Sequence, residues 1–319
     1  MLLSATFAAA IASSALANPV KRADGLSVKV TGPSSKLTNN GPEAVKVLKY
    51  GTVLDSLPTR SFTVSKDGTP VNFSGVKLSV ALNNDNAYTT IEAGKTVSVT
   101  HEVASLFDFA TAGTGKFSFL PNTDFRVTGV QQQVSHPAAL SKASAASEAI
   151  EVEQASFIES SYTESKELAS LASGYVSSNG AEDELFQAYF GGNDVSSVTG
   201  VLDKVTNEDD SSRTLSCVDE HDVCDGNVIA YTLVATTDIY YCDIFFDEVA
   251  TDALCGSVTV NDRKIRGGTT LHEASPGSHD TDDVIYGCPD DQALSDSEKI
   301  SNADNFNCFV TQVYADTKC

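Results

Sequence analysis

The chain has 319 residues, enough for two domains, and 21 basic against 43 acidic residues give it a formal net charge of −22. The charge is divided unevenly, because residues 1–141 carry 12 Lys+Arg and 9 Asp+Glu whereas residues 142–319 carry 9 and 34. A back half with so large an acidic excess repels nucleic acid and anionic membranes, so we expect neither as a partner.

The first residues are typical of a secretory signal peptide. An uncharged apolar run, residues 2–12, is followed by the small-residue site Ala15-Leu16-Ala17. No later apolar stretch approaches the ~20 residues that a membrane-spanning helix needs. We therefore expect a secreted, extracellular protein that is cleaved after Ala17, and cleaved again by a processing protease at the dibasic pair Lys21-Arg22.

Residues 26–130 predict a β-rich domain. Asp67-Gly68 predicts a hairpin turn, since both residue types tolerate the positive φ that such turns require. Asn72 begins an Asn-Phe-Ser glycosylation acceptor that would lie on the surface. Short, mostly alternating segments predict strands at residues 26–30, 44–48, 62–64, 76–80, 96–99 and 116–119. A series of short strands separated by turns is typical of an immunoglobulin-like β-sandwich.

The second half predicts a mainly helical fold with a small sheet. Residues 138–173 are rich in Ala, Ser, Glu and Lys with almost no Gly or Pro, which favours one long or two shorter helices. Further helices are expected at residues 181–190 and 295–314, and a strand pair at residues 228–234 and 239–246. All seven cysteines lie between residues 217 and 319, and in an exported chain they should be oxidised.

A His-Glu pair stands at His272-Glu273, preceded by Gly-Gly-Thr-Thr-Leu. In zinc peptidases this pair belongs to H-E-x-x-H, because histidines at i and i+4 share one helix face and can hold one metal. The Glu between them holds the attacking water. Position 276, where the second His is expected, is Pro. Residues 280–287 then read Asp-Thr-Asp-Asp-Val-Ile-Tyr-Gly.

Together these two segments resemble the deuterolysin family of fungal neutral proteases, in which H-E-x-x-H is followed by G-T-x-D-x-x-Y-G. Thr281, Asp283, Tyr286 and Gly287 match the second motif, and Asp280 replaces its first Gly. The likeness covers nearly the whole precursor. Other matching segments are Leu48 to Ser56, Ile91-Glu92-Ala93-Gly94, Cys217 and Cys224, Asn227 to Thr232, Tyr241-Cys242, and Asn302-Ala303-Asp304 through Cys319.

The resemblance implies three regions. Residues 1–17 would be the signal peptide, and residues 18–140 a β-sandwich-like propeptide that inhibits the enzyme intramolecularly. Residues 141–319 would form the α+β, zincin-like catalytic domain. The whole would be a monomeric zymogen of a metalloendopeptidase that favours basic protein substrates, and the acidity of the back half is consistent with that preference.

The resemblance also implies the roles of the site residues. One zinc ion would be bound by His272 and Asp283, and water on it would attack a polarised peptide carbonyl while Glu273 accepts the proton. Tyr286 would either donate to the oxyanion or serve as a packing residue. The implied disulfides join Cys224 to Cys242, Cys255 to Cys319 and Cys288 to Cys308, which leaves Cys217 unpaired. His101, His136 and His221 are expected to be surface or structural residues.

Three explanations for Pro276 stay open. In the first, three residues of the type x-Thr-His are missing between Glu273 and Ala274, through a misplaced splice junction or a true deletion. In the second, Pro276 ends the helix and His279 binds zinc from a loop, since Pro inside a helix removes a hydrogen bond and clashes with the previous turn. In the third, the chain is a metal-free relative. A catalytically impaired member that binds basic proteins without cleaving them is the alternative function.

Overall fold

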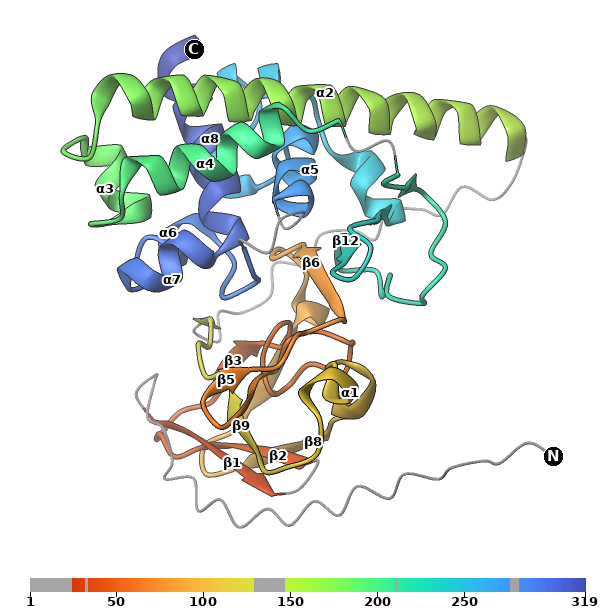
Figure 1. The fold of residues 1–319 in the computed structure, drawn as a ribbon, viewed down its shortest axis with the longest axis vertical. Helices are drawn as coiled ribbons and strands as arrows, with labels where there is room; N and C mark the ends of the chain where they lie inside the picture. Colours follow the sequence, from red (N-terminus) through yellow and green to blue (C-terminus); the bar gives the residue numbers. More distant parts are fainter. Residues whose placement is uncertain (1–24, 32–33, 129–146, 210–211, 276–280) are drawn as a thin grey trace.

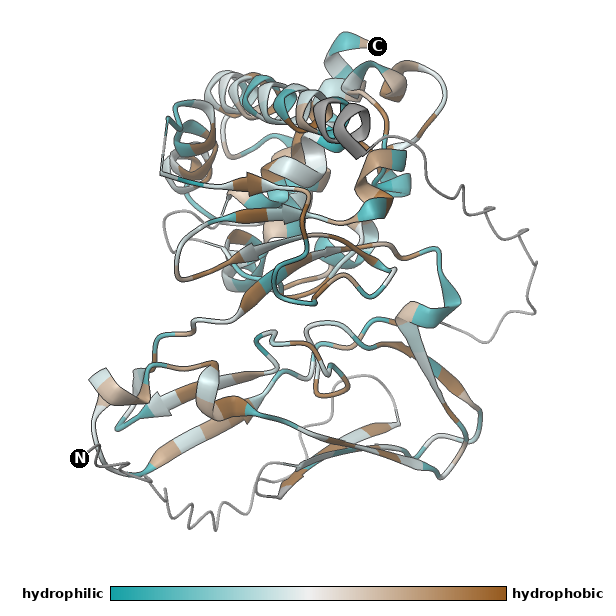
Figure 2. Cartoon of the chain, turned by 90° about the vertical axis from the view of Figure 1, so that its right-hand side faces the viewer, coloured by the Kyte–Doolittle hydropathy of each residue, from teal (hydrophilic) through white to brown (hydrophobic). Residues whose placement is uncertain are grey.

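The computed structural model describes residues 25–31, 34–128, 147–209, 212–275 and 281–319. The expected signal peptide, the processing sites Ala17, Lys21 and Arg22, and both His136 and His279 lie outside the described residues. Among the described helices none is long and apolar enough to cross a membrane. Figure 1 shows a β-rich part formed by the front of the chain and a helix-rich part formed by the back, and Figure 2 shows the same two layers from the side.

The front of the chain forms three antiparallel sheets of three strands each, in the orders β1-β2-β8, β10-β3-β7 and β5-β4-β9. Their inward faces share one core, which contains Leu37, Val47 and Phe62. Short helical turns connect them: η1 (Asp85–Ala87), η2 (Val103–Ser105) and α1 (Phe109–Ala112). The strands are β1 (Leu26–Thr31), β2 (Ser34–Asn39), β3 (Val45–Leu48), β4 (Phe62–Lys66), β5 (Thr69–Pro70), β7 (Tyr88–Ile91), β8 (Thr96–Thr100), β9 (Phe117–Pro121) and β10 (Val127–Thr128).

The hairpin prediction is confirmed. Lys66 pairs with Thr69 across a two-residue loop in which Asp67 has φ 51° and Gly68 has φ 84°. Positive φ at both central residues is the backbone geometry that favours Asp-Gly in such turns. Asn72 is exposed, as a glycosylation acceptor must be.

One predicted strand does not join the sheets of the front half. β6 (Val76–Val80) pairs antiparallel with β12 (Val228–Leu233), so the sheet order there is β11-β13-β12-β6. All five β6 residues are buried, including Lys77 and Ser79. The alternating pattern of residues 76–80 predicts a strand with one solvated face, and this part of the sandwich prediction is wrong. In Figure 1, β6 rises from the β-rich part toward β12 and α5.

The back of the chain is mainly helical, and α2 lies along the top of it (Figure 1). Buried side chains of α2, α4, α5 and α8, among them Leu168, Leu202, Leu271 and Phe309, form one hydrophobic cluster. The helices are α2 (Ser147–Asn179), α3 (Glu184–Phe190), α4 (Val195–Thr206), α5 (Arg266–Ala274), α6 (Cys288–Asp291), α7 (Asp296–Ser301) and α8 (Ala303–Lys318). The remaining elements are β11 (Leu215–Ser216), β13 (Ile239–Tyr241), η3 (Asp243–Asp247), η4 (Thr251–Cys255) and η5 (Val260–Asp262).

Several helix boundaries differ from the expected ones. α2 continues to Asn179, and the tail divides into α7 and α8 at Asn302. The side chain of Asn302 accepts hydrogen bonds from the backbone N–H groups of Val284 and Ile285 and donates to Asp291, so a polar junction interrupts the helix. Residues 243–247, expected to extend the second strand, form η3 instead.

Three disulfides join the pairs that the resemblance implies: Cys224 to Cys242, Cys255 to Cys319, and Cys288 to Cys308. The first links the loop before β12 to the end of β13. The other two attach η4 and α6 to the last helix, which contributes much of the core.

Cys217 is half-buried and has no disulfide partner among the described residues. In the family that the chain resembles, the corresponding cysteine closes a loop of roughly 70 residues, and such a loop is worth about 4 kcal/mol in the chain-entropy model. We expect the chain to be less heat-resistant than members of that family with the full set of disulfides. Peptide mapping of non-reduced protein should find Cys217 alkylated or joined to a second chain. An intramolecular disulfide from Cys217 would contradict this pairing.

Candidate metal centre

Helix α5 presents the His-Glu pair in the interior of the helical part. All residues from Gly267 to Ala274 are buried. The Gly-Gly pair at its start is required by close packing, since a Cβ on Gly267 would lie 2.7 Å from Cβ of Glu164 on α2. A Cβ on Gly268 would lie 2.4 Å from Oδ1 of Asn307 on α8. Two glycines therefore let α5 lie against both neighbouring helices and fix the position of His272.

The structure brings His272 and Asp283 together. His272 Nε2 lies 3.0 Å from Asp283 Oδ1, although the two residues belong to α5 and to the loop before α6. Both side chains are almost fully buried. Burial raises the pKa of Asp283. The hydrogen bond and charge of His272, together with the charge of Lys77, more than offset burial and hold this pKa below its usual range. The two residues proposed as metal ligands from the sequence therefore face each other.

Asp304 and Arg263 support His272 from behind. His272 Nδ1 lies 3.5 Å from Asp304 Oδ1, an ion-pair distance, and has no hydrogen-bond partner of good geometry among the described residues. Arg263 holds the same carboxylate through Nη2 at 2.5 Å, and Gly287 N donates to its other oxygen at 2.7 Å. Burial lowers the pKa of His272, but the carboxylates of Asp283 and Asp304 more than offset burial and raise it to about 9.

Glu273 is fully buried, and only one of its carboxylate oxygens has a partner. Thr232 Oγ1 on β12 donates to Oε2 at 2.6 Å, whereas Oε1 has no hydrogen-bond partner among the described residues. Burial raises the pKa of Glu273 to about 7, with His272 lowering it and Asp283 raising it. A carboxyl group with one free oxygen and a near-neutral pKa is suited to accept a proton.

Tyr286 packs against the same site. Its ring is stacked on His272 with 6.2 Å between centroids, and its side chain is 1% exposed. The hydroxyl has no hydrogen-bond partner of good geometry among the described residues. Burial and the nearby carboxylate of Asp283 raise the pKa of Tyr286 well above its ordinary value, so the hydroxyl keeps its proton. Packing and proton donation are both compatible with this position.

The donor set fits a zinc site in part. An imidazole nitrogen, a carboxylate and the unpaired Oε1 of Glu273 occupy one buried region. Catalytic zinc usually takes three protein ligands and one open position. No third acidic, His or Cys side chain among the described residues brings a ligand atom close to both His272 and Asp283. The cluster of Cys288, Asp291 and Cys308 offers no alternative, because its two sulfurs form a disulfide.

The other histidines within the described residues lie apart from this centre. His101 is buried in the β-rich part and packs edge-on against Phe62, with 4.9 Å between ring centroids. His221 is exposed in the loop after β11 and lies 5.2 Å from the ring of Tyr240. Each has a packing role, as the sequence predicted.

Four residues around the site had no role assigned from the sequence. Asp304 lies beside His272 and is itself held by Arg263, Thr232 donates to Glu273, and Lys77 comes from the front half of the chain. Asp304 and Thr232 lie in segments that match the family, which was the available signal. Lys77 carried no signal, because a lysine in an alternating strand ordinarily faces solvent.

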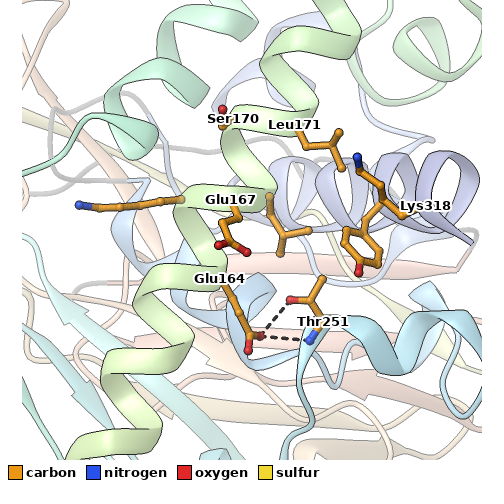
Figure 3. Close-up of a pocket in the computed structure, with 9 residues that line it drawn as sticks. Glu164, Glu167, Ser170, Leu171, Thr251 and Lys318 are labelled. Carbon is orange, nitrogen blue, oxygen red and sulfur yellow. Dashed lines mark hydrogen bonds between the residues drawn. The ribbon is translucent and has the colours of Figure 1, made fainter.

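A separate pocket of about 480 Å³ lies outside this centre, between α2, η4 and α8 (Figure 3). In it Glu164 accepts hydrogen bonds from the backbone N–H and the hydroxyl of Thr251. Glu164 also pairs with Arg266 at the start of α5. His272, Glu273 and Asp283 do not line this pocket. We assign a structural role to Glu164, whose pair with Arg266 joins α2 to α5.

A buried carboxyl beside α5 makes stability depend on pH. Burial raises the pKa of Glu248 to about 8 from an ordinary 4.5, although Thr269 donates to it at 2.9 Å. The folded chain thus keeps a proton that the unfolded chain releases. The stabilisation is complete below pH 4.5 and is lost as the pH rises through 8.

Glu248→Gln should remove this loss. Relative to the parent chain, the variant should gain on the order of 2–3 kcal/mol of unfolding free energy between about pH 5 and pH 8. Urea unfolding at the two pH values measures the gain. Glu182→Gln, at an exposed position, is the control and should leave the pH dependence of the parent chain unchanged. An equal pH dependence in Glu248→Gln would contradict the assignment.

Comparison with known proteins identifies relatives. The model of the deuterolysin metalloprotease (M35) family matches residues 1–319. A neutral protease 2 homolog of Phaeosphaeria nodorum is 30% identical over 96% of this chain and 96% of its own length. One of Aspergillus oryzae is 28% identical over 86% of this chain and 85% of its own length. A zinc peptidase from Grifola frondosa aligns with 50% of this chain and 95% of its own length, at 19% identity and with a TM-score of 0.36.

Proposed function

Because the chain belongs to the deuterolysin metalloprotease (M35) family, we propose that it is a secreted, zinc-dependent metalloendopeptidase made as a zymogen. It would hydrolyse internal peptide bonds of proteins. The observation that carries the proposal is the buried meeting of His272, Glu273 and Asp283, with 3.0 Å between His272 Nε2 and Asp283 Oδ1. Residues 1–17 would direct export, residues 18–140 would inhibit, and residues 141–319 would catalyse.

The residues of the site divide the work. Zinc, when bound, supplies a Lewis acid and an acidified water. Glu273 accepts the proton on its unpaired Oε1 while Thr232 holds Oε2. Asp304, itself fixed by Arg263 and Gly287 N, places its negative charge 3.5 Å from His272 Nδ1, while Nε2 faces Asp283. The free, protonated hydroxyl of Tyr286 is available to donate to a developing oxyanion.

We propose a preference for basic protein substrates, which the resemblance implies and with which the charge of the back half is consistent. The back half carries 34 acidic against 9 basic residues, and a field of that sign raises the local concentration of cationic partners. Asp282 and Asp283, with Glu273, place carboxylates at the site itself. In the ion pairs between the two halves, such as Arg60 with Asp282, the front half supplies the basic residue and the back half supplies the acidic one.

The second candidate function is a catalytically impaired member that binds basic proteins without cleaving them. It is favoured by one observation, namely that the described residues supply two of the three expected zinc ligands. The two functions share the acidic site and differ in zinc affinity and turnover. A reduced ligand set lowers zinc affinity and disturbs the open-site geometry.

For the chain as it stands, we expect substoichiometric zinc and little or no cleavage of protamine, a basic substrate. Metal analysis and gel electrophoresis of the digest measure the two quantities after the front half has been removed. Stoichiometric zinc with steady turnover would contradict this expectation and would make His279 the third ligand. His279→Ala should then abolish both zinc binding and cleavage.

A further inference from the structure

Strand β6 lies against the strand that orients the general base. In the antiparallel register, Lys77 is opposite Thr232, whose hydroxyl donates to Glu273 at 2.6 Å. Directly opposite residues on neighbouring strands share one face of a sheet. A segment from the front half of the chain therefore places a basic side chain on the same face of the sheet as Thr232, the residue of β12 that donates to Glu273 of α5.

Lys77 is held by the second motif. Its side chain is buried, and Nζ donates to Thr281 O at 2.7 Å and to Thr281 Oγ1 at 3.0 Å. Burial lowers the pKa of Lys77, and the negative charges of Asp283, Asp282 and Glu273 offset part of that effect by favouring the ammonium form. A buried ammonium group needs such compensation, because removal from water without it is costly.

The next residue of β6 contacts the zinc ligand itself. Leu78 N donates to Asp283 Oδ2 at 2.5 Å, while His272 Nε2 faces Oδ1 of the same carboxylate. Both oxygens of Asp283 are thereby engaged, one by the centre and one by the backbone of β6. A strand in this position leaves no room for another extended chain on that edge of β12.

Further contacts hold the front half on the same loop. Arg60 Nη1 pairs with Asp282 Oδ2 at 2.6 Å, and Arg126 Nη1 donates to Tyr286 O at 2.6 Å. Gly287, the last residue of the motif, has φ 108°, and a Cβ there would lie 1.7 Å from Arg126 Nη1. The glycine is thus needed both for the backbone geometry and for the approach of Arg126.

We propose that β6 is an inhibitory strand, which occupies the edge of β12 where an extended peptide substrate would pair, and that Lys77 is the side chain that anchors it. Pairing of a peptide with a free sheet edge is a general mode of recognition, with backbone bonds giving affinity and side-chain pockets giving selectivity. The proposal rests on the proposed peptidase function and specifies how its zymogen is closed. After release of the front half, a protein segment with a basic side chain would take the place of β6.

The test uses the full chain with a recognition site for a sequence-specific protease inserted after residue 140. After the cut, the two fragments stay associated through their contacts, and the dissociation constant is measured by dilution and size-exclusion chromatography. Lys77→Met should raise the constant by roughly 10- to 100-fold, because two hydrogen bonds from a charged donor are lost. Lys36→Met, at an exposed lysine of β2, should leave it unchanged.

Hydrogen exchange on the uncut chain distinguishes local loosening of β6 from misfolding of the whole β-rich part. Lys77→Met should accelerate exchange of the β6 amides and of the β12 amides, and leave β1 and β2 as in the parent chain. Faster exchange throughout the β-rich part, or a dissociation constant within two-fold of the parent, would overturn the proposal. Fragment association does not require turnover, so absence of peptidase activity in a chain whose H-E-x-x-H motif has been completed would overturn the proposed function and leave this result standing.

Discussion

Insertion of Ser-Thr-His between Glu273 and Ala274 should convert the chain into an active peptidase. The insertion completes H-E-x-x-H, and the new imidazole lies one helical turn beyond His272 on the same face of α5. Loss of an outer-shell partner alone costs metal sites about 10- to 100-fold in affinity, so the gain from a direct ligand should be at least about 100-fold. Cleavage of protamine by the chain freed of its front half is the measurement.

The matched control is an insertion of Ser-Thr-Gln at the same place. It lengthens α5 equally and adds no imidazole, so it separates the effect of the ligand from the effect of helix length. Activity in both insertion variants, or in neither, would contradict the assignment of the missing second histidine. Sequencing of the transcript across codons 270 to 284 then decides between a deletion and a misplaced splice junction.

Glu273→Gln in the chain with the restored motif should keep zinc and lose most proteolysis. The amide preserves the volume and the bond from Thr232, but it cannot accept a proton at neutral pH. Loss of a positioned general base lowers the rate by about 100- to 10,000-fold. The measurement is kcat/KM on protamine, together with zinc content as proof that the site is intact.

Glu182→Gln is the control for the second prediction, because this exposed glutamate lies at the start of α3, away from the site. It should retain both zinc and activity. Proteolysis in Glu273→Gln at a rate close to that of the restored chain would show that another group accepts the proton.

The contact of His272 with Asp283 could be predicted from the family resemblance, which implies that the residues at these two positions bind one metal ion. The supporting pair of Asp304 and Arg263 could not, since nothing near either residue indicates its partner 41 positions away. The partner of β6 was equally inaccessible. The alternation Val-Lys-Leu-Ser-Val indicates a strand but carries no information about which sheet it joins.

Local structure was predictable where one physical signal dominated. Asp67-Gly68 formed the predicted turn because both central residues of such a turn have positive φ, which few residue types other than Gly, Asn and Asp tolerate. Helix α4 was missed, since Val, Thr, Ser and Gly lower its intrinsic helix propensity, and packing of Val198 and Leu202 in the core stabilises it instead. Asn302 divides a predicted helix into α7 and α8 through hydrogen bonds that only the folded chain provides.

The central claim is that His272 and Asp283 are ligands of one zinc ion. Native mass spectrometry of the Ser-Thr-His insertion variant tests it most directly, with and without Asp283→Ala. We predict one zinc ion per chain in the insertion variant and almost none when Asp283 is replaced. One tightly bound zinc ion in both chains would contradict the account, because the metal would then be held elsewhere.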